Sequence, residues 1–151
     1  MTISLSLLAQ PHSAAVRSIV SQALKPGVDI DNLIIGQEEV RPDGDVNLPV
    51  YIDSDAYNDP TWLYRGSVIM RYKRLDLGET LGHIPLRVYV GPTYRSSTVV
   101  ARIAQVLQLH FSPSDYINEE FPLTTSTRSV LLKASPDSKR YKGEVSVIAY
   151  R

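Results

Sequence analysis

The sequence predicts an α+β fold in which two main helices pack on a mainly antiparallel sheet. Two segments carry apolar side chains at the 3.6-residue spacing that is typical of amphipathic helices. Several other segments alternate apolar with polar residues or are rich in β-branched residues, as strands are. These segments follow one another in a similar order in the two halves of the chain. That order predicts a duplicated helix–strand–strand unit.

The first helix is expected between Pro11 and Pro26, after a short N-terminal segment. Residues 2–8 alternate between apolar and polar side chains, which predicts a short strand or an extended arm. Ser13 is suited to cap the helix that follows, and Pro26-Gly27 ends it. The apolar stripe of this helix consists of Val16, Ile19, Val20, Ala23 and Leu24.

The rest of the first half is expected to form strands and their connections. The strands cover residues 33–35, 48–52 and 66–75. Residues 41–45 (Arg-Pro-Asp-Gly-Asp) place proline and glycine where turn geometry needs them. Residues 53–60 are polar, and we expect a loop there.

The second half contains a strand, the strongest helix pattern of the chain and a hairpin. The strand covers residues 86–90, and Ser96 or Ser97 is suited to cap the helix that follows. This helix carries a broad apolar stripe and stops before Pro113. The C-terminus has the pattern of a β-hairpin whose turn starts at residues 135–138. Its strands are expected at residues 130–134 and 144–150.

Residues 10–78 and 92–151 are the two halves of the predicted repeat. Each helix stripe ends at a proline, Pro26 in the first half and Pro113 in the second. Farther along, Tyr64-Arg-Gly-Ser-Val68 matches Tyr141-Lys-Gly-Glu-Val145. Because one such unit cannot cover its own sheet, we expect two copies to share one core as a single compact domain over residues 1–151. Chance similarity of two ordinary amphipathic helices is the alternative.

Composition and charge exclude several classes of protein. The chain has 151 residues, no cysteine, and 16 basic against 16 acidic side chains, which gives zero net charge. Without cysteine there are no disulfides, thiolate zinc sites or iron–sulfur clusters. The neutral charge argues against nucleic acid as the partner, since such binders usually carry a basic excess. No run approaches about 18 apolar residues, so we expect no membrane-spanning helix.

No arrangement of residues predicts an active site, a metal site or a cofactor. The histidines His12, His83 and His110 lie at no metal-ligand spacing. The aspartate-rich residues 53–59 lack the spacing, central glycine and glutamate of a calcium loop, so we expect a polar loop, and ion binding there stays open. An enzyme would need polar residues of both halves to converge in one pocket, and Asp53, Asp55 and His83 are the set to inspect. We therefore expect no enzyme, no cofactor and no small-molecule substrate.

Tyrosine and arginine on the predicted strands indicate contact surfaces for other proteins. The chain has nine tyrosines but two phenylalanines, and tyrosine and arginine are enriched in protein interfaces. Basic and aromatic residues together also bind single-stranded nucleic acid, but the neutral charge favours a protein partner. The N-terminal segment and the C-terminal strand could each extend the sheet of a neighbour. The expected interface residues are Ile3, Leu5, Leu7, Tyr64, Arg65, Arg71, Tyr72, Tyr141 and Tyr150.

Three segments of the first half resemble a known group of proteins. They are Asn32-Leu-Ile-Ile-Gly36, Asn47-Leu-Pro-Val-Tyr-Ile52 and Tyr64-Arg-Gly-Ser-Val-Ile-Met-Arg-Tyr-Lys-Arg-Leu-Asp-Leu77. In this order they resemble uncharacterised virion structural proteins of large tailed bacteriophages. The resemblance covers most of the first half, and it extends to the second half through the internal repeat.

The resemblance implies a structural subunit of the virion, in the tail, neck or baseplate. Such a subunit has no catalytic residues, is assembled in the host cytoplasm, and associates with itself and with other virion proteins. The alternative is a non-catalytic soluble adaptor that binds one protein partner. An adaptor would be a discrete monomer with one exposed patch.

Overall fold

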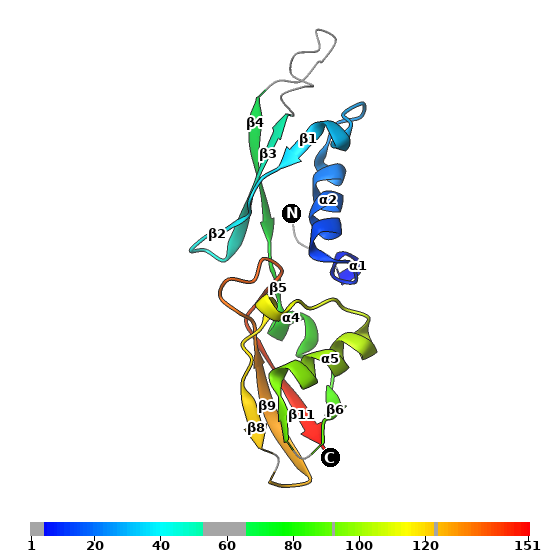
Figure 1. Ribbon diagram of the computed structural model, residues 1–151, viewed down its shortest axis with the longest axis vertical. Helices are drawn as coiled ribbons and strands as arrows, with labels where there is room; N and C mark the ends of the chain where they lie inside the picture. Colours follow the sequence, from blue (N-terminus) through cyan, green and yellow to red (C-terminus); the bar gives the residue numbers. More distant parts are fainter. Residues whose placement is uncertain (1–4, 53–65, 92, 123) are drawn as a thin grey trace.

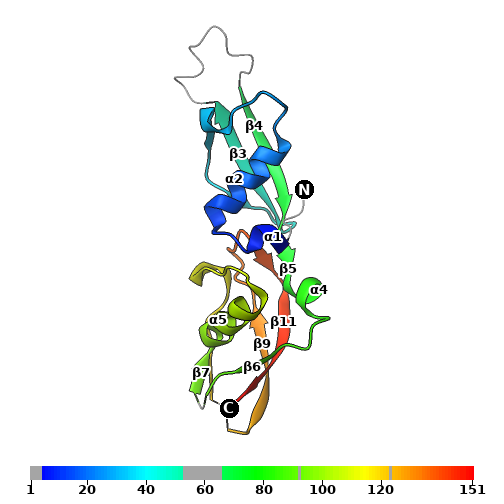
Figure 2. The same cartoon turned by 90° about the vertical axis from the view of Figure 1, so that its right-hand side faces the viewer.

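The α+β fold is confirmed by the computed structural model, which describes residues 5–52, 66–91, 93–122 and 124–151. The molecule is elongated in both views, with two lobes joined end to end (Figures 1 and 2). The N-terminal lobe lies above and ends with β4 (Ser67–Lys73), and the C-terminal lobe lies below. They meet where β5 (Leu75–Asp76) pairs in parallel with β10 (Tyr141–Lys142). We call β5, β10 and residues 135–140 the waist.

The first predicted helix is present as α2 (His12–Ala23). It begins directly after Pro11, where a missing N–H costs nothing because the first amides of a helix have no partner within it. Ser13 therefore lies inside the first turn, and the prediction that it caps the helix is wrong. The buried stripe consists of Ala15, Val16, Ile19 and Val20.

Residues 5–8 form a short helix, α1 (Leu5–Leu8), so the predicted strand or arm is wrong for these residues. The adjacent side chains of Leu7 and Leu8 are both buried, whereas a strand would send them to opposite faces. The backbone carbonyls of both leucines accept hydrogen bonds from Arg140, which lies far along the chain. This contact with a distant residue favours the helical turn, and it is invisible in the local pattern.

The sheet of the N-terminal lobe has β3 (Asp45–Ile52) at its centre. It pairs antiparallel with β4 on one side and with β1 (Leu33–Ile35) and β2 (Glu39–Val40) on the other. The 3-10 helix η1 (Ile30–Asn32) leads into β1. The predicted turn at residues 41–45 joins β2 to β3, with Gly44 in the left-handed region at φ +83°. Inward-facing side chains of β3 are buried in the core: Val46, Leu48 and Val50.

The sheet of the C-terminal lobe has β11 (Glu144–Tyr150) at its centre. It pairs antiparallel with β9 (Thr127–Lys133), which confirms the predicted hairpin, and parallel with β6 (Arg87–Tyr89). The second predicted helix is α5 (Ser96–Leu107), which buries Ser96, Val99, Val100 and Ile103. The remaining elements are β7 (Thr93–Arg95), the 3-10 helix η2 (Pro113–Asp115) and β8 (Glu120–Pro122), which pairs with β7.

A short helix that we did not predict, α4 (Leu77–Leu81), follows β5. The Asp76 carboxylate accepts hydrogen bonds from the N–H groups of Gly78 (2.9 Å) and Glu79 (3.2 Å). The helix buries Leu77 and Leu81. One continuous cluster of buried side chains then extends through both lobes, from Leu8 to Ala149.

The two halves show the same order of elements but different strand pairing. α2, η1, β1 and the strands β3 and β4 correspond in order to α5, η2, β8 and the strands β9 and β11. Gly66 (φ +105°) and Gly143 (φ +74°) each precede a strand of seven residues. However, the earlier of the two long strands is central in the N-terminal sheet and the later one in the C-terminal sheet. The duplication therefore stays a prediction.

Candidate functional site

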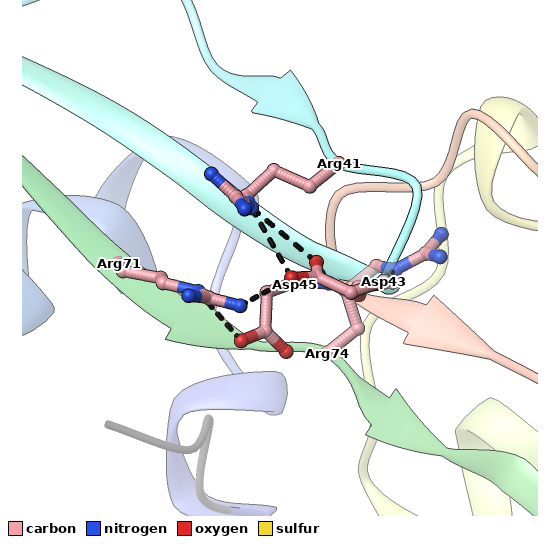
Figure 3. A network of polar contacts seen from close by, with 6 residues as sticks. Arg41, Asp43, Asp45, Arg71 and Arg74 are labelled. Atoms are coloured by element: carbon pink, nitrogen blue, oxygen red, sulfur yellow. Dashed lines mark hydrogen bonds and ion pairs between the residues drawn. The ribbon is translucent and has the colours of Figure 1, made fainter.

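A network of charged side chains surrounds the turn between β2 and β3, next to the waist (Figure 3). The Arg71 guanidinium on β4 donates from Nε to the Asp45 carboxylate at 2.8 Å and also binds Asp43. Arg41 lies on the other side of Asp43, with 3.3 Å between its Nε and the carboxylate. The backbone N–H of Asp45 and then the Arg41 side chain lower the pKa of Asp43. Both carboxylates of the turn are thus bound by arginines of the same lobe.

The network borders a shallow hollow with an excess of positive charge. Asp43, Asp45 and Arg71 line it together with Lys73 and Lys142. Arg74 also reaches this turn, where its Nε donates to the Gly44 carbonyl at 2.8 Å. With Arg41, five cations stand around two carboxylates, although the whole chain is neutral.

Two arginines stabilise the waist by donating hydrogen bonds to backbone carbonyls. Arg74, at the end of β4, donates from Nη1 to the carbonyls of Pro136 (3.1 Å) and Ser138 (2.9 Å). Since Arg74 also binds Gly44, it connects the N-terminal lobe with the segment before β10. The Tyr72 hydroxyl oxygen lies 3.1 Å from the Lys139 carbonyl oxygen, so Tyr72 also contacts this segment.

The second arginine, Arg140, is buried and holds α1 against the waist. Its Nη2 donates to the carbonyls of Leu8 (3.0 Å) and Gln10 (2.8 Å). Its Nη1 lies 3.2 Å from Nδ1 of His110, which must accept because a guanidinium can only donate. The guanidinium therefore joins the N-terminal segment, the region after α5 and the waist, and its role is structural.

His12, Glu38 and Tyr72 form the arrangement that most resembles an acid–base site. Nε2 of His12 lies 2.6 Å from the Glu38 carboxylate, which also accepts a hydrogen bond from the Tyr72 hydroxyl. Burial raises the pKa of Tyr72, and the hydrogen bond to Glu38 raises it further. Because the Tyr72 ring is in the core, a substrate cannot reach this hydroxyl. Across the described ranges, no three potential metal-binding side chains of the His, Asp or Glu type gather at one point.

Three of the expected interface residues are core residues. Leu7, Tyr72 and Tyr141 are all buried, so the prediction that they form a contact surface is wrong. The hydroxyl of Tyr141 donates to the His110 carbonyl at 2.9 Å, and its ring stacks on Phe111 with 4.4 Å between the centroids. Tyrosine is amphipathic, and here an internal partner for the hydroxyl allows the ring to be buried.

The other expected interface residues have different outcomes. Arg71 and Tyr150 are exposed on β4 and β11. Leu5 is the first residue of α1. Ile3, Tyr64 and Arg65 lie outside the described residues, as do Asp53, Asp55 and the rest of the 53–59 loop, whereas His83 is exposed.

Comparison with known proteins gives a family but no activity. A family model described as "Family of unknown function (DUF7941)" matches residues 32–151. The chain belongs to this family. No curated protein matches it. No solved structure matches it either.

The part shared with the DUF7941 family contains every strand and the whole waist. It starts after α2, at the end of η1, and includes both partners of the charged network, the β2–β3 turn and β4. No helix in the described part of this DUF7941 chain is long and apolar enough to cross a membrane.

Apolar side chains are exposed on the outer faces of the two sheets, and Tyr150 alone among them is one of the expected interface residues. In the N-terminal lobe they are Ile34, Tyr51 and Ile69, and in the C-terminal lobe Tyr89, Leu131, Ile148 and Tyr150. The signal was present in the strands, because apolar residues stand at the positions that alternate with the buried ones. These two faces are the surfaces of this DUF7941 protein on which a partner could bury apolar area.

Proposed function

We propose that this protein is a structural subunit of a tailed-phage virion, in the tail, neck or baseplate. It works by self-association and by docking to neighbouring subunits. The observation that supports this proposal is the exposed apolar outer face of each sheet. The place in a virion rests on the sequence resemblance.

The outer face of the N-terminal sheet is a continuous apolar strip. Ile34 of β1 is directly across from Tyr51 of β3, and both are exposed. On the other side of β3, Pro49 is across from Ile69, whose side chain is 67% exposed. Monomeric proteins rarely expose large apolar patches, and those rimmed by polar groups often mark interaction sites. Here the ion pairs of Arg71 form the rim.

The outer face of the C-terminal sheet has the same character. Ile148 and Tyr150 of β11 are exposed, and Leu131 of β9 is exposed on the same face, across from Ser146. Tyr89 of β6 is across from Tyr150, and the two rings meet edge to face with 5.9 Å between their centroids. Exposed tyrosines of this kind provide large contact areas at a low cost in side-chain entropy.

The bonds at the waist suit a subunit that keeps a fixed shape. Arg74 and Arg140 donate to backbone carbonyls on both sides of the junction, so the two faces keep their relative positions. A pre-ordered surface binds with a smaller entropic penalty than a flexible one.

The first test is the mass of the purified chain in solution, measured by light scattering over a range of concentrations. We expect an oligomer that is lost when Leu131 and Ile148 are both changed to glutamate. Val106→Glu is the matched control, because Val106 is an exposed apolar residue of α5 and lies on neither strand face. A monomer at every concentration, together with absence of the chain from purified virions, would contradict the proposal and favour the adaptor.

A further inference from the structure

In the part of the chain that the structure describes, β4 is an edge strand of the N-terminal sheet. Within the described residues, β4 pairs with β3 alone. Val50 of β3 and Val68 of β4 are direct neighbours on the helix-covered face, yet Val50 is 4% exposed and Val68 is 57% exposed. Ile69, on the opposite face of the same strand, is exposed as well. Apolar side chains are therefore exposed on both faces of one edge strand, where an additional strand would cover them.

The backbone of β4 also presents hydrogen-bonding groups at this edge. The Pro49 carbonyl on β3 accepts from the Gly36 N–H at 2.8 Å, on the side of β1. In an antiparallel strand the N–H and C=O of one residue point to the same side, so Pro49 and its neighbour Ile69 do not bond to each other. The N–H and C=O of Ile69 consequently point away from β3. Long edges with unprotected apolar residues are ready templates for another strand.

Charge indicates what kind of strand fits. The lower end of β4 carries Lys73, and Lys142 lies in the same hollow. Neither lysine forms an ion pair with another described residue. The nearby carboxylates are already bound, Asp43 and Asp45 by arginines and Asp76 by the first amides of α4. A partner that brings its own carboxylates to this end would complement the excess positive charge.

We infer that the β4 edge binds an extended, acidic segment of a neighbouring protein, which becomes an additional strand of the N-terminal sheet. Apolar side chains of this segment cover Val68 and Ile69, and its carboxylates lie beside Lys73 and Lys142. Backbone hydrogen bonds to Ile69 fix its register. The inference rests on the proposed assembly function, for which it names one contact and the chemistry of its partner.

The experiment uses the full chain and a labelled peptide in which four consecutive valines, which reach both faces of a strand, are followed by threonine alternating with two glutamates. The reversed sequence is included because the direction of the added strand is not fixed, and lysines replace the glutamates in a control peptide. We expect the acidic peptide to bind in one direction, measured by fluorescence anisotropy. On binding, the amide of Ile69 should become protected from hydrogen exchange.

Three variants test the backbone and the charge separately. Ile69→Pro removes one outward donor without touching a bond to β3, and should weaken binding about tenfold. Ile69→Ser, which removes the apolar side chain without adding charge and should also weaken binding, is the second variant, in case the proline lowers the melting temperature. The double variant Lys73→Glu with Lys142→Glu should also weaken binding about tenfold and favour the lysine peptide. Arg102→Glu is the control, because this exposed arginine lies on α5 of the C-terminal lobe.

Failure to bind either acidic peptide overturns the inference, as does equal binding by wild type and the Ile69 variants. Binding of a single-stranded oligonucleotide in place of the peptide, lost with Lys73 and Lys142, would make the hollow a nucleic-acid site and also overturn it. Oligomers of the wild-type chain without peptide binding would refute the edge contact alone. Peptide binding by a chain that is absent from virions would refute the proposed function alone.

Discussion

The buried tyrosines make the stability of this protein sensitive to alkaline pH. Tyr72 and Tyr141 are both in the core, and burial is the main cause that raises the pKa of each hydroxyl. In the unfolded chain a tyrosine loses its proton near pH 10. Between pH 10 and the higher pKa of the folded state, the folded chain therefore holds more protons than the unfolded chain. The stability from these hydroxyls is complete below pH 10 and decreases as the pH rises.

The size of the effect follows from the number of protons. Each tyrosine that stays protonated only in the folded state lowers the free energy of unfolding by about 1.4 kcal/mol for each pH unit above 10. The pair should therefore lower the free energy of unfolding by about 2.7 kcal/mol per unit. Domains are stable by only about 5–15 kcal/mol, so the loss of about 5.4 kcal/mol over two pH units above 10 would unfold a chain at the lower end of this range.

Urea unfolding at a series of pH values measures this slope, and absorbance at 295 nm follows tyrosinate formation directly. We expect Tyr72 and Tyr141 to titrate only on unfolding. The double variant Tyr72→Phe with Tyr141→Phe should show a much smaller slope. Titration of both buried hydroxyls near pH 10 in a chain that stays folded would refute the reasoning.

Four other substitutions test the packing, each by urea unfolding. Tyr94→Phe should be neutral or stabilising by up to about 1 kcal/mol, because the buried Tyr94 hydroxyl has no hydrogen-bond partner in the described structure; a loss above 1 kcal/mol contradicts this. Arg140→Met should lower the free energy of unfolding by about 2–3 kcal/mol, because buried carbonyls lose a charged donor. It should also speed amide hydrogen exchange in α1. Unchanged exchange would disprove the idea that Arg140 holds α1 in place. Gly143→Ala should lower the free energy of unfolding by about 2–3 kcal/mol, and Gly27→Ala by about 1 kcal/mol. Both glycines have a positive φ, but of the two only Gly143 would bring an added Cβ against Asp76, at 2.9 Å. Equal losses would show that this contact is unimportant.

The helices and the long strands could be predicted because their signals are local. α2 and α5 follow from apolar periodicity, and the hairpin of β9 and β11 follows from alternation around a turn. α4 could have been found as well, since Asp76 and Glu79 stand at the spacing of a helix cap and its third residue.

The features that failed depend on distant residues. The helical turn at Leu7 is held by Arg140, and the burial of Tyr141 depends on a carbonyl at His110. Exposure of Val68 depends on whether any strand lies beyond β4, which a pattern of alternating residues does not reveal. The turn aspartates Asp43 and Asp45 were expected from turn chemistry, but their arginine partner on β4 was not.

Cross-linking mass spectrometry on purified virions tests the proposed assembly function most directly. Lys73 and Lys133 lie on the outer faces of the two sheets, whereas Lys25 lies beside the end of α2. The account predicts that the chain is present in many copies, and that Lys73 and Lys133 form cross-links to neighbouring subunits more often than Lys25. Absence of the chain from virions, or intersubunit cross-links from Lys25 alone, would contradict it.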